Sequence, residues 1–141
     1  MAEKCGGPGE ARFSLIIRGN DLPFEELEKS LALTGARIVR KGEVLNRLPR
    51  IEATEDEWVY SVELNNPAGE DEALNALLTD IDLHREALDA IAKTYRVTLR
   101  LYVQSDRAQI AYRLMPETLT RLTSTSLPLD VTSLSWGEIG I

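Results

Sequence analysis

The side chains best suited to binding chemistry are arginines and one tyrosine that alternate with apolar residues. Between Tyr95 and Val103 every second residue is apolar, and Arg96, Arg100 and Tyr102 lie at the positions between. Successive side chains of a strand point to opposite faces of a sheet, so the pattern predicts one packed face and one face that carries these three residues. Guanidinium groups recognise carboxylates and phosphates in paired geometry. The pattern therefore indicates binding of an anionic group.

Two further predicted strands can add cations to the same face. Arg12 and Arg18 take the outward positions of the segment 12–18, and Arg113 takes an outward position of the segment 108–114. If these strands adjoin the segment 95–103, the cations form one patch. The competing interpretation is that long arginines only cover an exposed sheet and pair with neighbouring acids such as Glu63. The candidate binding residues are Arg12, Arg18, Arg96, Arg100, Tyr102 and Arg113.

A second candidate site combines the turn Lys41-Gly42-Glu43 with Trp58. Lys41 and Glu43 offer two opposite charges that could engage a small ligand. A glycine in such a turn more often serves backbone geometry, and a tryptophan in a strand more often serves the core. The sequence leaves both interpretations open.

The sequence gives little support for a catalytic site or a metal-binding site. The 141 residues include one cysteine and one histidine, Cys5 and His84, which excludes a structural zinc site built from these ligands. Cys5 lies in a Gly/Pro-rich stretch where nothing would lower its pKa. His84 has no visible nucleophile or orienting partner for a role as general base. We expect no metal and no cofactor.

The periodicity of the chain predicts an α+β fold. We expect the first six elements to form a ferredoxin-like antiparallel sheet, extended by a further strand, helix and strand, with all helices on one face. Residues 44–56 are expected to form a mobile connection, and residues 70–93 to form one helix or two. Residues 1–10 are expected to be a flexible tail and 11–141 a single domain. The predicted strands are 12–18, 36–39, 58–64, 95–103, 108–114 and 127–136, the fifth forming a hairpin with the fourth, and the helices are 23–34, 70–93 and 116–122.

Composition and charge narrow the classes of function. Hydrophobic residues make up 43% and charged residues 28% of the chain, as in ordinary folded domains. The net charge of −7 disfavours nucleic acid and anionic membranes as partners. No apolar run is long enough to span a bilayer, and the first ten residues lack the apolar region of a secretory signal. We therefore expect a cytoplasmic protein.

Several short motifs from Arg12 to about Trp136 resemble the domain-of-unknown-function 4279 family of bacterial proteins. The resemblance implies a compact single domain and carries over no activity. The motifs are Gly19-Asn20-Asp21, Glu25-Glu26-Leu27, Lys41-Gly42-Glu43, Trp58, Leu114-Met115-Pro116-Glu117 with Leu119 and Leu122, and Leu129-Asp130-Val131.

Together these observations favour a small cytoplasmic protein-binding or regulatory module without catalytic activity. Its expected partner is another protein with an acidic surface, or a second copy of the chain that associates through the open sheet face. The alternative is a small-ligand-binding protein or an enzyme that uses carboxylate and arginine groups. A concave pocket with converging polar groups would favour the alternative, and an exposed patch would favour the module.

Overall fold

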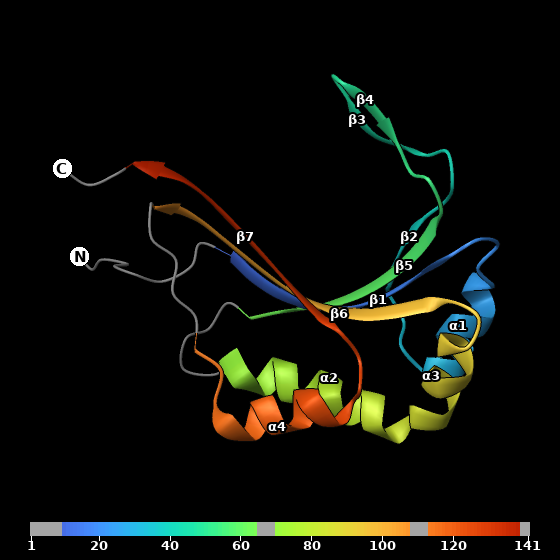
Figure 1. Cartoon of the computed structure of the whole chain (residues 1–141), viewed down its shortest axis with the longest axis vertical. Helices are drawn as coiled ribbons and strands as arrows, with labels where there is room; N and C mark the ends of the chain where they lie inside the picture. The colour runs from blue at the N-terminus through green and yellow to red at the C-terminus, as the bar shows by residue number, and fades with distance from the viewer. Residues whose placement is uncertain (1–9, 65–69, 108–112, 139–141) are drawn as a thin grey trace.

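The computed structural model describes residues 10–64, 70–107 and 113–138 (Figure 1). Of the predicted tail, residues 1–9 lie outside the described residues, and Glu10 is the first residue of a strand. The elements in chain order are β1 (Glu10–Gly19), α1 (Phe24–Leu31), β2 (Arg37–Val39), β3 (Val44–Arg47), β4 (Arg50–Glu52), β5 (Asp56–Glu63), α2 (Glu70–Leu83), α3 (Arg85–Ala92), β6 (Arg96–Arg107), α4 (Pro116–Ser124) and β7 (Leu129–Glu138).

Five strands form one sheet in the order β2-β5-β1-β6-β7. β1 lies at the centre and pairs antiparallel with β5 and β6, while β2 pairs antiparallel with β5. Without the small β3–β4 sheet, the elements β1 to β6 follow the order of the ferredoxin-like motif, except that two helices, α2 and α3, take the place of its second helix. The predicted α+β class is confirmed. Phe13 to Ile17 of β1 are all buried: the helices cover one face of this strand, and side chains of the neighbouring strands β5 and β6 surround the other.

The extension of this sheet differs from the predicted one. β7 runs parallel to β6, and the connection between two parallel strands passes through α4, because parallel neighbours need a crossover. The predicted hairpin between 95–103 and 108–114 is wrong, since β1 and β7 are the neighbours of β6. Residues 108–112 lie outside the described residues, and Arg113 and Leu114 belong to no strand.

Residues 44–56 are ordered, so the predicted mobile connection is also wrong. β3 and β4 form a hairpin, which we call the arm (residues 42–53). At its base the Gly42 amide donates to the Ala53 carbonyl at 2.8 Å, and the Ala53 amide donates to the Glu43 carbonyl at 2.8 Å. Every side chain of β3 and β4 is exposed. With no buried face, the sequence has no apolar alternation to mark these strands.

The four helices lie on one side of the sheet, as predicted (Figure 1). Phe13, Leu15, Trp58 and Leu99 point from the sheet into a core that also receives Leu74 and other helix residues. The helical stretch 70–93 is two helices that meet at His84, whose ring nitrogen Nδ1 lies 3.0 Å from the Asp80 carbonyl. The opposite face of the sheet carries no helix within the described ranges.

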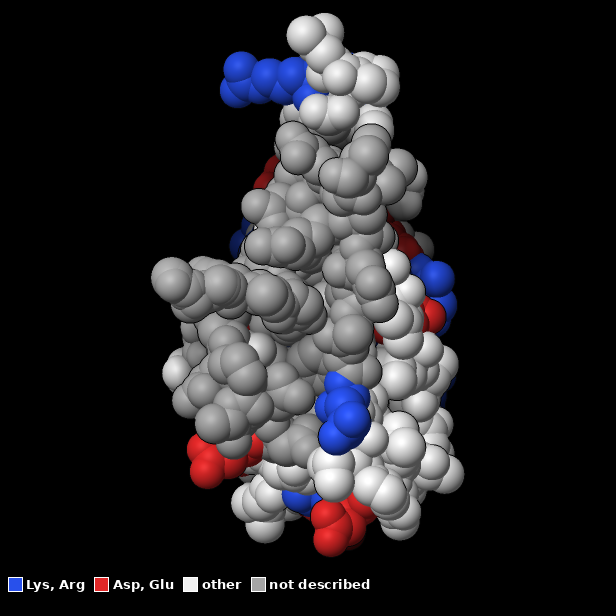
Figure 2. Space-filling model, turned by 90° about the vertical axis from the view of Figure 1, so that its left-hand side faces the viewer, with Lys and Arg blue, Asp and Glu red and all other residues white. Residues whose placement is uncertain are grey.

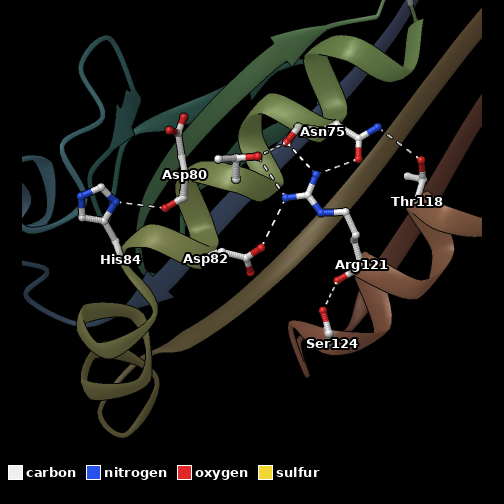
Figure 3. A network of polar contacts seen from close by, with 8 residues as sticks. Asn75, Asp80, Asp82, His84, Thr118, Arg121 and Ser124 are labelled. Carbon is white, nitrogen blue, oxygen red and sulfur yellow. Dashed lines mark hydrogen bonds and ion pairs between the residues drawn. The ribbon is translucent and has the colours of Figure 1, made fainter.

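Arg121 fastens α4 to α2 and so fixes the crossover that delivers β7 (Figure 3). Its guanidinium donates to Asn75 Oδ1 at 3.0 Å and to Thr79 Oγ1 at 3.0 Å, and it pairs with Asp82 at 3.3 Å. Asn75 Nδ2 in turn donates to Thr118 Oγ1 on α4 at 3.4 Å. The polar groups between these two helices therefore satisfy one another.

Candidate anion-binding face

The sheet is curved, so that its open face is concave (Figure 1). The arm rises at one end, and the far ends of β6 and β7 rise at the other (Figure 1). The outward residues of β1 are Arg12, Ser14, Ile16 and Arg18, as the alternation predicts. Arg18 lies at the end of β1 nearest the arm, because its partner Glu57 is the second residue of β5, the strand that follows the arm. The middle of this face thus consists of alternate side chains of β1, β5 and β6, with the arm at one end and the far ends of β6 and β7 at the other.

A groove of about 430 Å³ occupies the middle of this face. Of the predicted binding residues, Arg12, Arg100 and Tyr102 line it together. β2 contributes Arg37, which was not among the predicted binding residues. Its position opposite Val59 on β5 places it on this face. We call the set Arg12, Arg37, Arg100 and Tyr102 the arginine groove.

Arg100 is the central cation of the arginine groove. In the pairing register it lies between Ser14 of β1 and Asp130 of β7. Burial lowers the pKa of Arg100; Glu57 acts against that effect, and the positive charges of Arg18, Arg12 and Arg37 add to it. Its Nε atom is buried and has no hydrogen-bond partner among the described residues. A partly desolvated guanidinium among like charges is stabilised by an incoming anion.

Hydroxyl groups and an aromatic ring complete the groove. Ser14 Oγ and Ser61 Oγ lie 2.7 Å apart on its floor and can supply a hydroxyl hydrogen bond to a ligand. The Arg12 guanidinium stacks over the Tyr102 ring at 4.8 Å from the ring centroid, which orients its planar donors. Among the described lining residues Glu63 is the one acid. The donors outnumber the acceptors, so the groove suits an anionic or acceptor-rich group.

Arg18 and Arg96 lie on the same face beside each other, nearer the arm, and already have partners. Arg18 Nε donates to Glu57 at 2.6 Å, and Arg96 forms an ion pair with Glu55. The interpretation in which arginines pair with neighbouring acids therefore describes this end of the face. It describes Arg100 less well: the charge of Glu57 favours its protonated form, but Arg100 forms no ion pair among the described residues and its Nε atom has no hydrogen-bond partner there.

The other predicted site residues are not brought together. Arg113 lies before α4, outside the sheet. Trp58 is 1% exposed and points into the core, whereas Lys41 and Glu43 lie on the exposed turn at the base of the arm. The structure therefore contains no common pocket for Lys41, Glu43 and Trp58. Gly42 of that turn has φ +90°, a conformation that favours glycine, so its role is in backbone geometry.

Asp56 attaches the arm to the sheet. Its carboxylate accepts hydrogen bonds from the Lys41 amide at 2.8 Å and from the Leu22 amide at 3.1 Å. The hydrogen bond from Lys41 is the largest cause that lowers the pKa of Asp56; burial opposes it, and the Leu22 amide and the charge of Arg40 add to the lowering. One carboxylate thus holds the turn before the arm and the loop before α1 in a fixed relation to β5.

Arg or Lys side chains appear at the top of Figure 2, where the arm lies, and both basic and acidic side chains appear at the lower end. No group of three or more potential metal-ligating side chains exists within residues 10–64, 70–107 and 113–138. None of the helices in those ranges has the length and apolar character needed to cross a membrane.

The chain belongs to the family described as domain of unknown function (DUF4279), whose model matches residues 9–136. The resemblance inferred from the short motifs is thereby confirmed. Comparison with curated proteins and with solved structures gives no match.

Proposed function

We propose that this protein is a cytoplasmic binding module that recognises acidic groups of a partner protein in its arginine groove and has no catalytic activity of its own. The observation that carries the proposal is Arg100, a partly buried cation with an unsatisfied Nε atom and three arginines around it. In a chain of net charge −7, arginines gathered on one face repel one another, and a bound anion would offset that repulsion.

The shape of the site supports a macromolecular partner. The groove brings polar groups together, as the small-ligand alternative predicts, but its lining is mainly polar and lies on an exposed sheet face, whereas small-molecule sites enclose most of their ligand and are lined mainly by apolar groups. Nucleic acid is a weaker candidate, because sheet-face readers of RNA stack bases on two or three aromatic rings and this groove offers Tyr102. Two copies meeting face to face would oppose the same arginines, which repel each other.

The proposal predicts selective binding of an acidic peptide. A peptide of about ten glutamates, long enough to span the groove, should bind at low salt, and Arg100→Gln should weaken its binding by about tenfold. The matched control is Arg85→Gln, which removes the same charge from α3 on the helical side. Its affinity should stay within about twofold of the wild type. Titration calorimetry measures the dissociation constant of the peptide for the wild type and for each of the two variants.

Two results would contradict the proposal. Absence of measurable binding to the wild type is one. Equal weakening by Arg100→Gln and Arg85→Gln is the other, because attraction would then depend on total charge and not on the groove. Chain mass in solution, measured by light scattering with and without peptide, reports whether self-association accounts for any binding signal.

A further inference from the structure

The arm carries exposed apolar side chains that the proposed function does not use. Leu48 at its tip is 90% exposed, Leu45 is 51% exposed and Ile51 is 47% exposed. Large apolar side chains gathered on one projecting element typically mark an interaction surface. A two-stranded hairpin is marginally stable by itself. The arm is nevertheless fixed at its base by the Asp56 carboxylate and by the main-chain bonds between Gly42 and Ala53.

The arm and the turn before it (residues 40–53) carry more cations than acids, so this part of the surface is cationic as well as apolar: the cations are Arg40, Lys41, Arg47 and Arg50, and the acids are Glu43 and Glu52. Glu52 pairs with Arg50 at 2.7 Å, Glu57 pairs with Arg18, and Asp56 accepts backbone amides. Arg47 and Lys41 remain exposed. A ligand segment that contacts the arm is therefore expected to combine apolar and acidic side chains, the same charge preference as that of the arginine groove.

The arm and the groove lie at opposite ends of the same sheet face. Leu45 lines a small hollow of about 120 Å³ together with Arg18, Val39 and Glu57, at the arm end of the open face. Arg12 lines the groove at the other end of the same strand. From Arg12 to Arg18 a strand advances six residues, about 20 Å. An extended peptide of similar length reaches from the groove to the arm and presents alternate side chains to the sheet.

We infer that the occupant of the open face is an extended segment of a partner protein in which alternate acidic residues face the arginine groove and apolar residues at one end pack against Leu45, Leu48 and Ile51. This inference rests on the proposed function and adds the identity of the bound segment. The acidic residues supply the match to Arg100, and the arm supplies apolar contact beside it. The arm therefore determines which end of the segment lies over Arg18.

Three synthetic peptides of roughly eight residues test the inference, since this length covers the path along β1. The first alternates Glu and Ser. The second and third carry two additional leucines at the amino or the carboxyl end. One leucine peptide should bind the wild type about tenfold more tightly than the peptide without leucine, because two leucine side chains become partly buried. The other should gain less, since only one orientation brings leucine to the arm.

The double variant Leu45→Ser/Leu48→Ser should abolish that gain and leave the affinity for the leucine-free peptide within about twofold of the wild type. Leu119→Ser is the matched control, because it removes an exposed leucine from α4 and should preserve the gain. Arg100→Gln should weaken all three peptides. Circular dichroism confirms that each variant is folded.

The outcomes separate the two proposals. If the leucine-free peptide binds through Arg100 but leucine adds nothing, or the gain survives loss of Leu45 and Leu48, the inference about the arm is overturned and the proposed function stands. If Arg100→Gln changes no affinity, the proposed function is overturned. Arm-dependent binding to vesicles of phosphatidylglycerol and phosphatidylcholine that is tighter than peptide binding would identify a lipid surface and overturn the peptide occupant.

Discussion

Arg121 and Arg100 are two partly buried arginines on opposite sides of the same sheet. The Arg121 guanidinium donates hydrogen bonds to Asn75, Thr79 and Asp82 and thereby holds α4 against α2 (Figure 3). Arg100 has a buried Nε atom without a partner among the described residues and lies near three other arginines. The same residue type therefore stabilises the fold on one side and stays available for a ligand on the other. Satisfied donors distinguish a structural arginine from a binding one.

Leu99 and Arg100 are neighbours on β6 whose side chains lie on opposite faces of the sheet, so they allow a direct comparison of the two sides. Leu99 is fully buried beneath the helices, and Leu99→Ala should lower the free energy of unfolding by about 3 kcal/mol because it leaves a cavity in the core. Arg100→Gln should leave that free energy within about 0.5 kcal/mol or raise it, because a partly desolvated charge among like charges is removed. Urea denaturation measures both. A loss of stability in Arg100→Gln comparable to that in Leu99→Ala would show that Arg100 is structural.

The second prediction concerns the helical side. Arg121→Ala should lower the free energy of unfolding by about 2 kcal/mol, because several hydrogen bonds to Asn75, Thr79 and Asp82 are lost together. Binding of the acidic peptide should stay within about twofold of the wild type. Arg85→Ala on α3, whose ion pair with Asp89 is exposed, is the control and should change stability little. A binding defect in Arg121→Ala without a stability defect would reverse the roles assigned to the two arginines.

The smallest expected effect is the pH dependence from Asp56. Its pKa is lowered in the folded protein, so the unfolded chain binds the proton more readily, with an ordinary value of 3.8. The contribution of Asp56 to stability is therefore present above pH 3.8 and is lost as the pH falls through the lower folded pKa. Asp56→Asn should show a weaker fall in stability over this acid range, measured by thermal unfolding at several pH values. An unchanged pH profile would mean that the carboxylate does not hold the arm.

Most of the main sheet could be predicted from the sequence, because its central strands bury one face and expose the other. Alternation identified β1, β5 and the first part of β6, and it also assigned Arg12, Arg100 and Tyr102 to one face. Proline and acidic residues in the first turn marked the start of α4. These signals are local, so they survive without knowledge of which strands are neighbours.

The predictions that were wrong concern features that depend on which strands lie next to each other. The arm shows no alternation because all its β3 and β4 residues are exposed, and it is held by main-chain hydrogen bonds that any sequence can supply. The pairing of β6 with β7 was missed because proximity in sequence favoured residues 108–114 as its partner. Arg37 was missed because β2 is too short for its pattern to settle which side faces the groove.

The sequence by itself determined the α+β class and the faces of the long strands, and through them the positions of Arg12, Arg18, Arg96 and Arg100 on the open face, because those properties depend on the periodicity of single segments. The tertiary structure decided which neighbours those arginines have. It paired Arg18 with Glu57 and Arg96 with Glu55, and it placed Arg100 beside Arg12 and Arg37. It also placed the arm at the Arg18 end of the same face. Long-range strand pairing sets these distances, and no local pattern encodes it.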